Sequence, residues 1–172
     1  MFYFVLLIEE EIMRIQEQFD YVYNENVKSL FNIAYGYLKD KEDSADVIQT
    51  VFLKALDKNI NFKTYDDIKY YLIRITINCC LDLLKSSYKK KVVLNNEMVM
   101  NFNETKNESS SNLNLVAYID KLSDKYKTII ILRYYDLMSI SEIAQTLRIS
   151  VDATKKRLER AKKMIKTLME RN

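Results

Sequence analysis

The chain has 172 residues, with 27 Lys or Arg against 24 Asp or Glu, so its formal net charge is +3. It contains one Gly, no Pro and no His. This composition disfavours an all-β fold built on tight turns, glycine-rich phosphate loops and histidine-based catalysis or metal binding. Hydrophobic residues make up 48% of the chain, which is enough to bury a core.

An apolar run occupies residues 2–8 and is followed by three glutamates. It is too short to span a membrane, which takes about 20 residues, and it lacks the layout of a signal peptide. Cys79 and Cys80 are adjacent, so they do not form a disulfide framework and fit a reducing compartment. We therefore expect a cytoplasmic protein with no membrane insertion.

Charge is distributed unevenly along the chain. Residues 1–67 carry seven basic and thirteen acidic side chains, whereas residues 68–94 carry six basic and one acidic. Residues 113–172 carry thirteen basic and seven acidic side chains. Two basic blocks in a small chain indicate a polyanionic partner. The Asn- and Ser-rich stretch 95–112 predicts a flexible linker between a domain at 1–94 and a domain at 113–172.

Apolar residues at helical spacing predict three helices in the N-terminal domain. The first covers about residues 23–38. The second begins near a cap at Asp43 and buries a stripe of Ile48, Val51, Phe52 and Ala55. The third covers about residues 67–85 and is apolar on two sides, which predicts that neighbouring elements enclose it.

Basic and aromatic side chains gather on and before the third predicted helix. Arg74, Asn78 and Lys85 fall on one strip, and Phe62, Tyr65 and Tyr71 lie close by in the sequence. Such aromatics are core residues in most proteins, but charge and ring stacking together are also how single-stranded nucleic acid is held.

The C-terminal domain carries a helix-turn-helix pattern. Ser139 and Glu142 predict a capping box, and after a short turn Ser150 predicts the cap of a second helix. That helix has an apolar stripe that begins at Thr154 and Leu158 and a basic opposite face, which is the pattern of a major-groove recognition helix. Two further helices, near residues 116–122 and 126–133, precede the motif. The sequence thus predicts an all-α protein of two small helical domains, the C-terminal one with four helices.

Three stretches resemble the extracytoplasmic-function (ECF) sigma factors of bacterial RNA polymerase. Residues 43–55 resemble the pattern DAEDxxQExFLxA, and residues 71–85 resemble WLxRIAxNxxxDxxRR. Residues 122–161 resemble the family's last helices, including EIA at 142–144 and RLxRA at 157–161. Two departures stand out, because Tyr71 replaces the usual Trp and Arg148 replaces a common Gly of the turn.

The resemblance implies a sigma factor that directs core polymerase to promoters and performs no catalysis. The implied partners are the β′ clamp and β flap of the core enzyme, the −10 and −35 promoter elements, and an anti-sigma factor; no cofactor, metal or small-molecule substrate is implied. The implied polymerase-binding residues are Asp46, Gln49, Phe52 and Leu53. The implied −10 residues are Phe62, Tyr65, Tyr71, Arg74, Asn78 and Lys85. The implied −35 residues are Ser150, Asp152, Ala153, Thr154, Lys155, Lys156, Arg157 and Arg160.

Two other functions remain open at this point. A helix-turn-helix regulator that acts as a dimer without polymerase would have a dimerisation helix in place of the strip with Asp46 and Gln49. A helical adaptor or anti-sigma-type interaction protein would leave both basic blocks solvated and would show no salt-dependent DNA binding. An enzyme is disfavoured, because no set of catalytic residues can be assembled.

Overall fold

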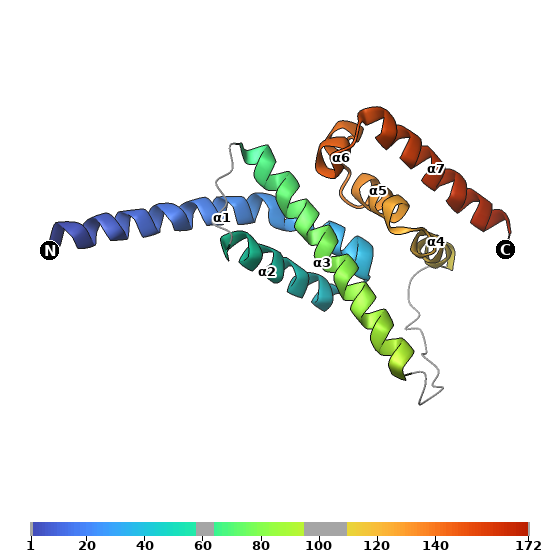
Figure 1. Ribbon diagram of the computed structural model, residues 1–172, viewed down its shortest axis with the longest axis horizontal. Coiled ribbons are helices and arrows are strands. Elements are labelled where there is room, and N and C mark those ends of the chain that lie inside the picture. The colour runs from blue at the N-terminus through green and yellow to red at the C-terminus, as the bar shows by residue number, and fades with distance from the viewer. Residues whose placement is uncertain (1, 58–63, 95–109, 172) are drawn as a thin grey trace.

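The computed structural model describes residues 2–57, 64–94 and 110–171, and these residues form helices and connections without any strand. The helices of this part of the chain are α1 (Phe2–Leu38), α2 (Lys41–Asp57), α3 (Tyr65–Leu94), α4 (Ser110–Asp120), α5 (Asp124–Tyr134), α6 (Ile140–Leu147) and α7 (Val151–Glu170). They form two groups, α1–α3 and α4–α7 (Figure 1). The predicted all-α class is confirmed. The predicted linker lies outside the described residues except at its end, where α4 already begins at Ser110.

Helices α1, α2 and α3 enclose the core of the N-terminal domain. Its fully buried side chains include Leu30, Ile33, Val51, Leu72 and Ile73, and burying one such side chain stabilises the fold by about 1.5–3 kcal/mol. The predicted stripe of α2 is confirmed, because its first three members are buried and its last is partly buried. Helix α3 is enclosed as predicted, between α1 and α2 on one side and α6 on the other.

The start of α2 differs from the prediction. Its cap is Asp40, whose Oδ1 accepts a hydrogen bond from the backbone N–H of Asp43 at 2.9 Å. The prediction of Asp43 as the cap is therefore wrong, since that residue lies in the first turn of the helix. Helix α1 ends at Leu38, and the following Lys39 has a left-handed φ of 59°. The chain reverses there, so the next helix can begin directly after Asp40.

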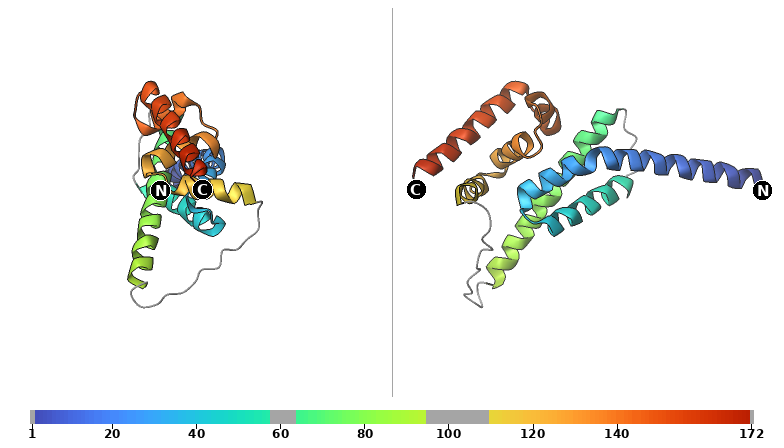
Figure 2. Two further views of the ribbon diagram at one scale, coloured as in Figure 1. Left: turned by 90° about the vertical axis from the view of Figure 1, so that its right-hand side faces the viewer. Right: turned by 180° about the vertical axis from the view of Figure 1, so that it is seen from behind.

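Helix α1 is longer than the sequence pattern predicted. It extends back to Phe2, and its N-terminal part leads away from the other helices (Figure 1 and the right view of Figure 2). Residues 2–22 contain neither Gly nor Pro, so no helix stop signal separates them from the predicted helix.

The C-terminal domain is built around α5, which packs on α4, α6 and α7. Ile129, Ile131 and Leu132 of α5 are fully buried. The predicted capping box is confirmed: the Ser139 hydroxyl accepts from the Glu142 N–H at 3.2 Å, and the Glu142 carboxylate accepts from the Ser139 N–H at 2.9 Å. The four helices and the helix-turn-helix formed by α6 and α7 are as predicted.

The turn of the helix-turn-helix places Arg148 in the left-handed region, with φ 53° and ψ 46°. This backbone lets the N–H of Ile149 reach the carbonyl of Ala144 at 3.0 Å, which closes the end of α6. Glycine is the residue that normally holds this conformation, and a side chain there costs about 1 kcal/mol. The second helix of the motif then begins at the cap Ser150, whose hydroxyl accepts from the Ala153 N–H at 3.1 Å.

The two domains pack directly on one another, with α1 against α5 and α3 against α6. The only glycine of the chain lies at this crossing: a Cβ added to Gly36 would come within 2.8 Å of Cγ2 of Ile131. Beside it, the hydroxyls of Tyr37 and Thr128 form a buried hydrogen bond of 2.6 Å. Gly36 therefore permits a close helix crossing rather than a turn.

Candidate nucleic-acid and protein interfaces

The outer face of α2 combines exposed polar groups with an apolar groove. Asp46 and Gln49 are exposed, and Leu53 is 66% exposed. The groove between α1 and α2 has a volume of about 450 Å³. Its lining residues are Phe19, Tyr23, Val27, Phe31, Ala45, Ile48, Gln49, Phe52, Leu53 and Leu56. This surface can receive an apolar side chain of a protein partner beside a carboxylate that attracts a cation.

Phe52 has a different position from the other predicted polymerase-binding residues. It is only 4% exposed, and its ring packs against those of Phe19 and Tyr23, with centroids 5.9 and 4.7 Å away. It therefore shapes the groove from below rather than offering a free surface. The sequence analysis did not select Tyr23 and Leu56, which are 39% and 52% exposed at the same groove. Leu56 could have been found from its i+3 spacing to Leu53.

Five of the predicted −10 residues lie on α3, Tyr65 at its start and the other four further along it. Asn78 and Lys85 are exposed, whereas Tyr71 and Arg74 are half-buried. The Arg74 guanidinium donates to the carbonyl oxygen of Thr146 in α6, with an N–O distance of 3.3 Å. The C-terminal domain thus covers the N-terminal half of this strip and leaves its C-terminal half open.

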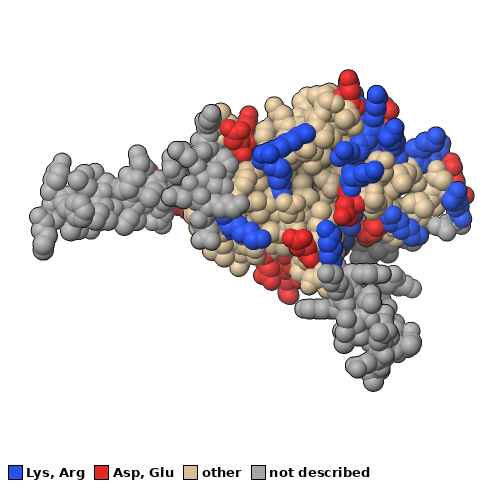
Figure 3. Space-filling model, viewed as in Figure 1, with Lys and Arg blue, Asp and Glu red and all other residues tan. Residues whose placement is uncertain are grey.

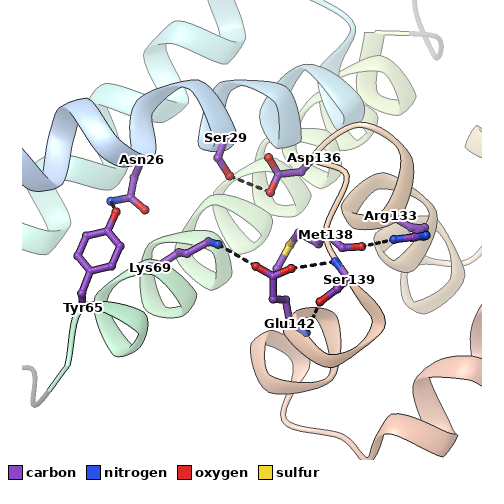
Figure 4. Close-up of polar contacts among 9 residues, drawn as sticks. All are labelled: Asn26, Ser29, Tyr65, Lys69, Arg133, Asp136, Met138, Ser139 and Glu142. Carbon is purple, nitrogen blue, oxygen red and sulfur yellow. Dashed lines mark hydrogen bonds and ion pairs between the residues drawn. The ribbon is translucent and has the colours of Figure 1, made fainter.

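Tyr65 lies at the start of α3 and is tied to α1. Its hydroxyl accepts a hydrogen bond of 2.9 Å from the amide of buried Asn26 (Figure 4). Its ring meets that of Tyr21 edge to face, with the centroids 5.7 Å apart. Burial is the main reason that the pKa of Tyr65 lies above its ordinary value. The ring is therefore held in place at one end of the α3 strip. Phe62 lies outside the described residues.

Helix α7 presents most of the predicted −35 residues on its solvent side. Lys155, Lys156 and Arg160 are exposed and Arg157 is half-buried. Figure 3 shows basic side chains gathered over the C-terminal helices. At the start of the helix, the set continues with the exposed residues Ser150 and Asp152 and the half-buried residue Ala153.

Thr154 does not fit the predicted −35 set. Its side chain is fully buried, and its hydroxyl donates to the carbonyl oxygen of Ser150 at 3.0 Å. It lies four residues before Leu158 and seven before Ala161, which are buried on the same face of α7. Thr154 therefore belongs to the core of the C-terminal domain, and the prediction that it contacts DNA is wrong.

Polar contacts join the two domains beside α3 (Figure 4). Lys69 forms an ion pair of 3.0 Å with Glu142, and Ser29 donates to Asp136 at 2.8 Å. The backbone N–H of Ser139, together with Lys69, lowers the pKa of Glu142. Burial raises the pKa of Asp136 to about 6. The capping box of α6 thus also serves the domain interface, which the sequence analysis did not predict.

Two family models match this chain and together cover most of it. The model described as sigma-70 region 2 matches residues 22–90, and the model described as sigma-70 region 4 matches residues 112–165. One range lies within α1–α3 and the other within α4–α7. The chain belongs to the ECF sigma factors.

Relatives and solved structures agree with this assignment. The sigma factor is 28% identical to RNA polymerase sigma factor SigV of Bacillus subtilis over 139 residues, which are 81% of this chain and 83% of the relative. It is 23% identical over 151 residues to ECF sigma factor SigW of the same organism, covering 80% and 81% of the two chains.

Two solved structures share the fold of the sigma factor. The structure of CnrH in complex with the cytosolic domain of CnrY has a TM-score of 0.64 at 23% identity, and covers 91% of this chain and 90% of that one. The sigma factor RpoE of Bartonella quintana, solved in complex with the anti-sigma factor NepR, has a TM-score of 0.59 at 15% identity, and covers 91% and 97%.

The sigma factor directs core RNA polymerase to promoters and initiates transcription. The independent helix-turn-helix regulator is not favoured, because the polymerase-associated region 2 is present as well as region 4. Among the residues that the structure describes, no helix has both the length and the apolar character needed to cross a membrane.

Proposed function

We propose that the sigma factor uses three separate surfaces for polymerase, the −10 element and the −35 element. The main support is that α2, α3 and α7 each have exposed polar or basic side chains on one side, while other residues of the same helix are buried in the core. On α2 and α7, residues that form the core and exposed residues that can bind partners thereby lie on different sides of the helix, and on α3 the exposed residues are Asn78 and Lys85 of the C-terminal half of the strip.

The α2 surface is the proposed docking site for the β′ clamp. Asp46 and Gln49 supply polar contacts at its rim, and Leu53 and Leu56 supply exposed apolar area at the groove. Exposed apolar groups that border a concave surface, next to a charge, are typical of protein interfaces. The β flap is the second proposed contact of the core enzyme, with the C-terminal domain.

The α3 and α7 surfaces are the proposed DNA contacts. On α3, Asn78 offers an amide for base edges and Lys85 a charge for phosphate, with Tyr65 held nearby for stacking. On α7, Lys155, Lys156, Arg157 and Arg160 would neutralise phosphates, and residues of the first turn would reach base edges. The phosphodiester chemistry belongs to the polymerase.

The decisive experiment compares the promoter affinity of the free sigma factor, core polymerase alone and their mixture. Core polymerase should fix the spacing of the two DNA-binding domains, an effective-concentration gain of about 100-fold or more without any new contact. Tight, sequence-specific binding by the free protein as a homodimer would contradict the proposal and favour the independent regulator.

Reversing one charge tests the α2 surface. Asp46→Arg should weaken core polymerase binding by about tenfold or more, which corresponds to about 1.4 kcal/mol, with an unchanged circular dichroism melt. Glu17→Arg on α1 is the matched control, because it makes the same charge change at another exposed helical position of the domain. Equal capture of core polymerase by both variants would refute this docking site.

An anti-sigma factor is a further proposed partner. This proposal is supported by the fold shared with RpoE, which was solved bound to the anti-sigma factor NepR. Such a partner should compete with core polymerase for the sigma factor, so a purified candidate should lower core binding in a pull-down. A ternary complex of sigma factor, candidate and core polymerase would contradict the competition.

A further inference from the structure

A cleft lies where α2 and α3 meet the turn of the helix-turn-helix. It has a volume of about 620 Å³, within the range of small-molecule sites. Its lining residues are Lys54, Tyr71, Arg74, Ile75, Asn78, Cys79, Asp82 and Arg148. Seven of these come from the N-terminal domain and one, Arg148, comes from the C-terminal domain, so the cleft exists in this form only while the domains are packed together.

The charged groups at this cleft are unbalanced. Three cationic side chains, Lys54, Arg74 and Arg148, line it together with a single carboxylate, that of Asp82. Burial lowers the pKa of Arg74, and repulsion from Arg148 lowers it further. Arg74 and Arg148 come from different domains and both line this cleft, so an anion bound there would reduce the repulsion between them.

Arg148 adopts a backbone conformation that is strained for a residue with a side chain. It occupies the left-handed position at the end of α6, where glycine would be free of strain. None of the three proposed surfaces uses its side chain. The side chain of Arg148 at this cleft is therefore a feature that neither the turn nor the proposed polymerase and DNA contacts require.

We propose that this cleft binds a nucleotide that carries several phosphates, with Arg148, Arg74 and Lys54 around the phosphates and Tyr71 and Asn78 beside the base. Arginine pairs with phosphate through two parallel hydrogen bonds, and lysine acts as a point charge. A tyrosine ring and an amide are the groups that stack on a base and bond to its edge. A small nucleotide fits a cleft of this volume, whereas a DNA duplex does not.

Such a ligand would act on the domain arrangement, because it bridges side chains from both domains. A ligand that binds only the packed form stabilises that form by mass action. The bound nucleotide would hold α6 over Tyr71 and Arg74 and keep the −10 element from reaching them. This regulatory consequence rests on the proposed function of the α3 surface, whereas the binding site does not.

Calorimetric titration of the full chain tests the site directly. The probes are ATP, inorganic phosphate and a short single-stranded oligonucleotide, at constant ionic strength. ATP should bind at least about tenfold more tightly than inorganic phosphate. Arg148→Gly should weaken ATP binding by about tenfold or more without loss of stability, because glycine relieves the left-handed backbone. Lys166→Ala is the matched control, since it removes one exposed cation of α7 away from the cleft.

Permanganate footprinting with core polymerase tests the consequence. ATP should lower promoter opening with the natural chain and not with Arg148→Gly. Equal ATP affinity of the natural chain and Arg148→Gly, or binding of the oligonucleotide without binding of ATP, would overturn the proposed site. If the natural chain opens no promoter at all with core polymerase, the proposed function fails, while the titration still decides the site.

Discussion

The two proposed DNA surfaces differ in how accessible they are. The basic side of α7 faces solvent, and its capped start at Ser150 is open. The α3 strip is half covered, because Arg74 is engaged by the carbonyl of Thr146 and Lys69 by Glu142. In this arrangement the sigma factor can present the proposed −35 surface but not the whole of the proposed −10 surface. Domain separation, rather than local refolding, would expose the rest.

The largest expected effect concerns Tyr65, the proposed stacking residue at the N-terminal start of α3. Tyr65→Ala should reduce open promoter complexes more than closed ones, by about 1–3 kcal/mol for each base that loses its stacking partner. Permanganate footprinting measures the open fraction. Tyr65→Phe keeps the ring and loses only the hydrogen bond from Asn26. If both variants open promoters equally poorly, the residue acts through the fold and not through stacking.

A second variant should open the covered part of the α3 strip. Gly36→Leu places a side chain where even a Cβ would approach Ile131, and overpacking of this kind costs about 1–3 kcal/mol. The domains should separate, which small-angle scattering would detect as a larger radius of gyration. The affinity for single-stranded −10 DNA should rise as well. Lys28→Leu, at an exposed position of α1, is the control. An unchanged radius for Gly36→Leu would show that the crossing adapts without opening.

The exposed surface of α7 should respond to salt. Lys156→Ala should lower the slope of log affinity against log salt by about one unit, because one phosphate contact is lost. Thr154→Val should leave the slope unchanged and lower the free energy of unfolding by about 1 kcal/mol, since it loses the hydrogen bond to Ser150 but keeps its volume. A change of slope with Thr154→Val would indicate that Thr154 does contact DNA.

The smallest expected effect is a pH dependence of the domain interface. Burial raises the pKa of Asp136 to about 6, so the packed form takes up this proton more readily than the unfolded chain. Stability should therefore rise as the pH falls from about 7 to 5, by about 1 kcal/mol or less because the group is partly solvated. Thermal melts of the natural chain and of Asp136→Asn, which should lack this rise, measure it.

Glu142 sets the lower limit of this pH window. Its pKa is lowered, chiefly by the Ser139 N–H and then by Lys69. Its contribution to stability is present above its ordinary pKa and is lost as the pH falls through the lowered value. Measurements above about pH 5 therefore report Asp136, and a fall in stability there on acidification would contradict the expected sign.

Local patterns in the sequence determined much of the fold. The capping box of Ser139 and Glu142, the cap at Ser150 and the buried stripe of α2 depend on contacts within a few residues, so spacing alone was enough to predict them. The left-handed backbone of Arg148 could also be predicted, because the resembling family commonly has glycine at that position. For the same reason, the exposed residues of α2 and α7 could be selected by the side of the helix on which they fall.

Only the tertiary structure decided what lies between the domains. Gly36 and Ile131 are far apart in the sequence, and nothing local shows that α1 crosses α5 at that point. Likewise, the sequence predicts Glu142 only as a capping residue, and the structure adds its ion pair with Lys69 of the other domain. Thr154 lies at both an apolar spacing and a recognition-helix position, and only its complete burial in the folded domain decided between them. The spacing of apolar residues predicts which face of a helix is buried. Which neighbouring helix covers that face depends on packing between segments that are far apart in the sequence.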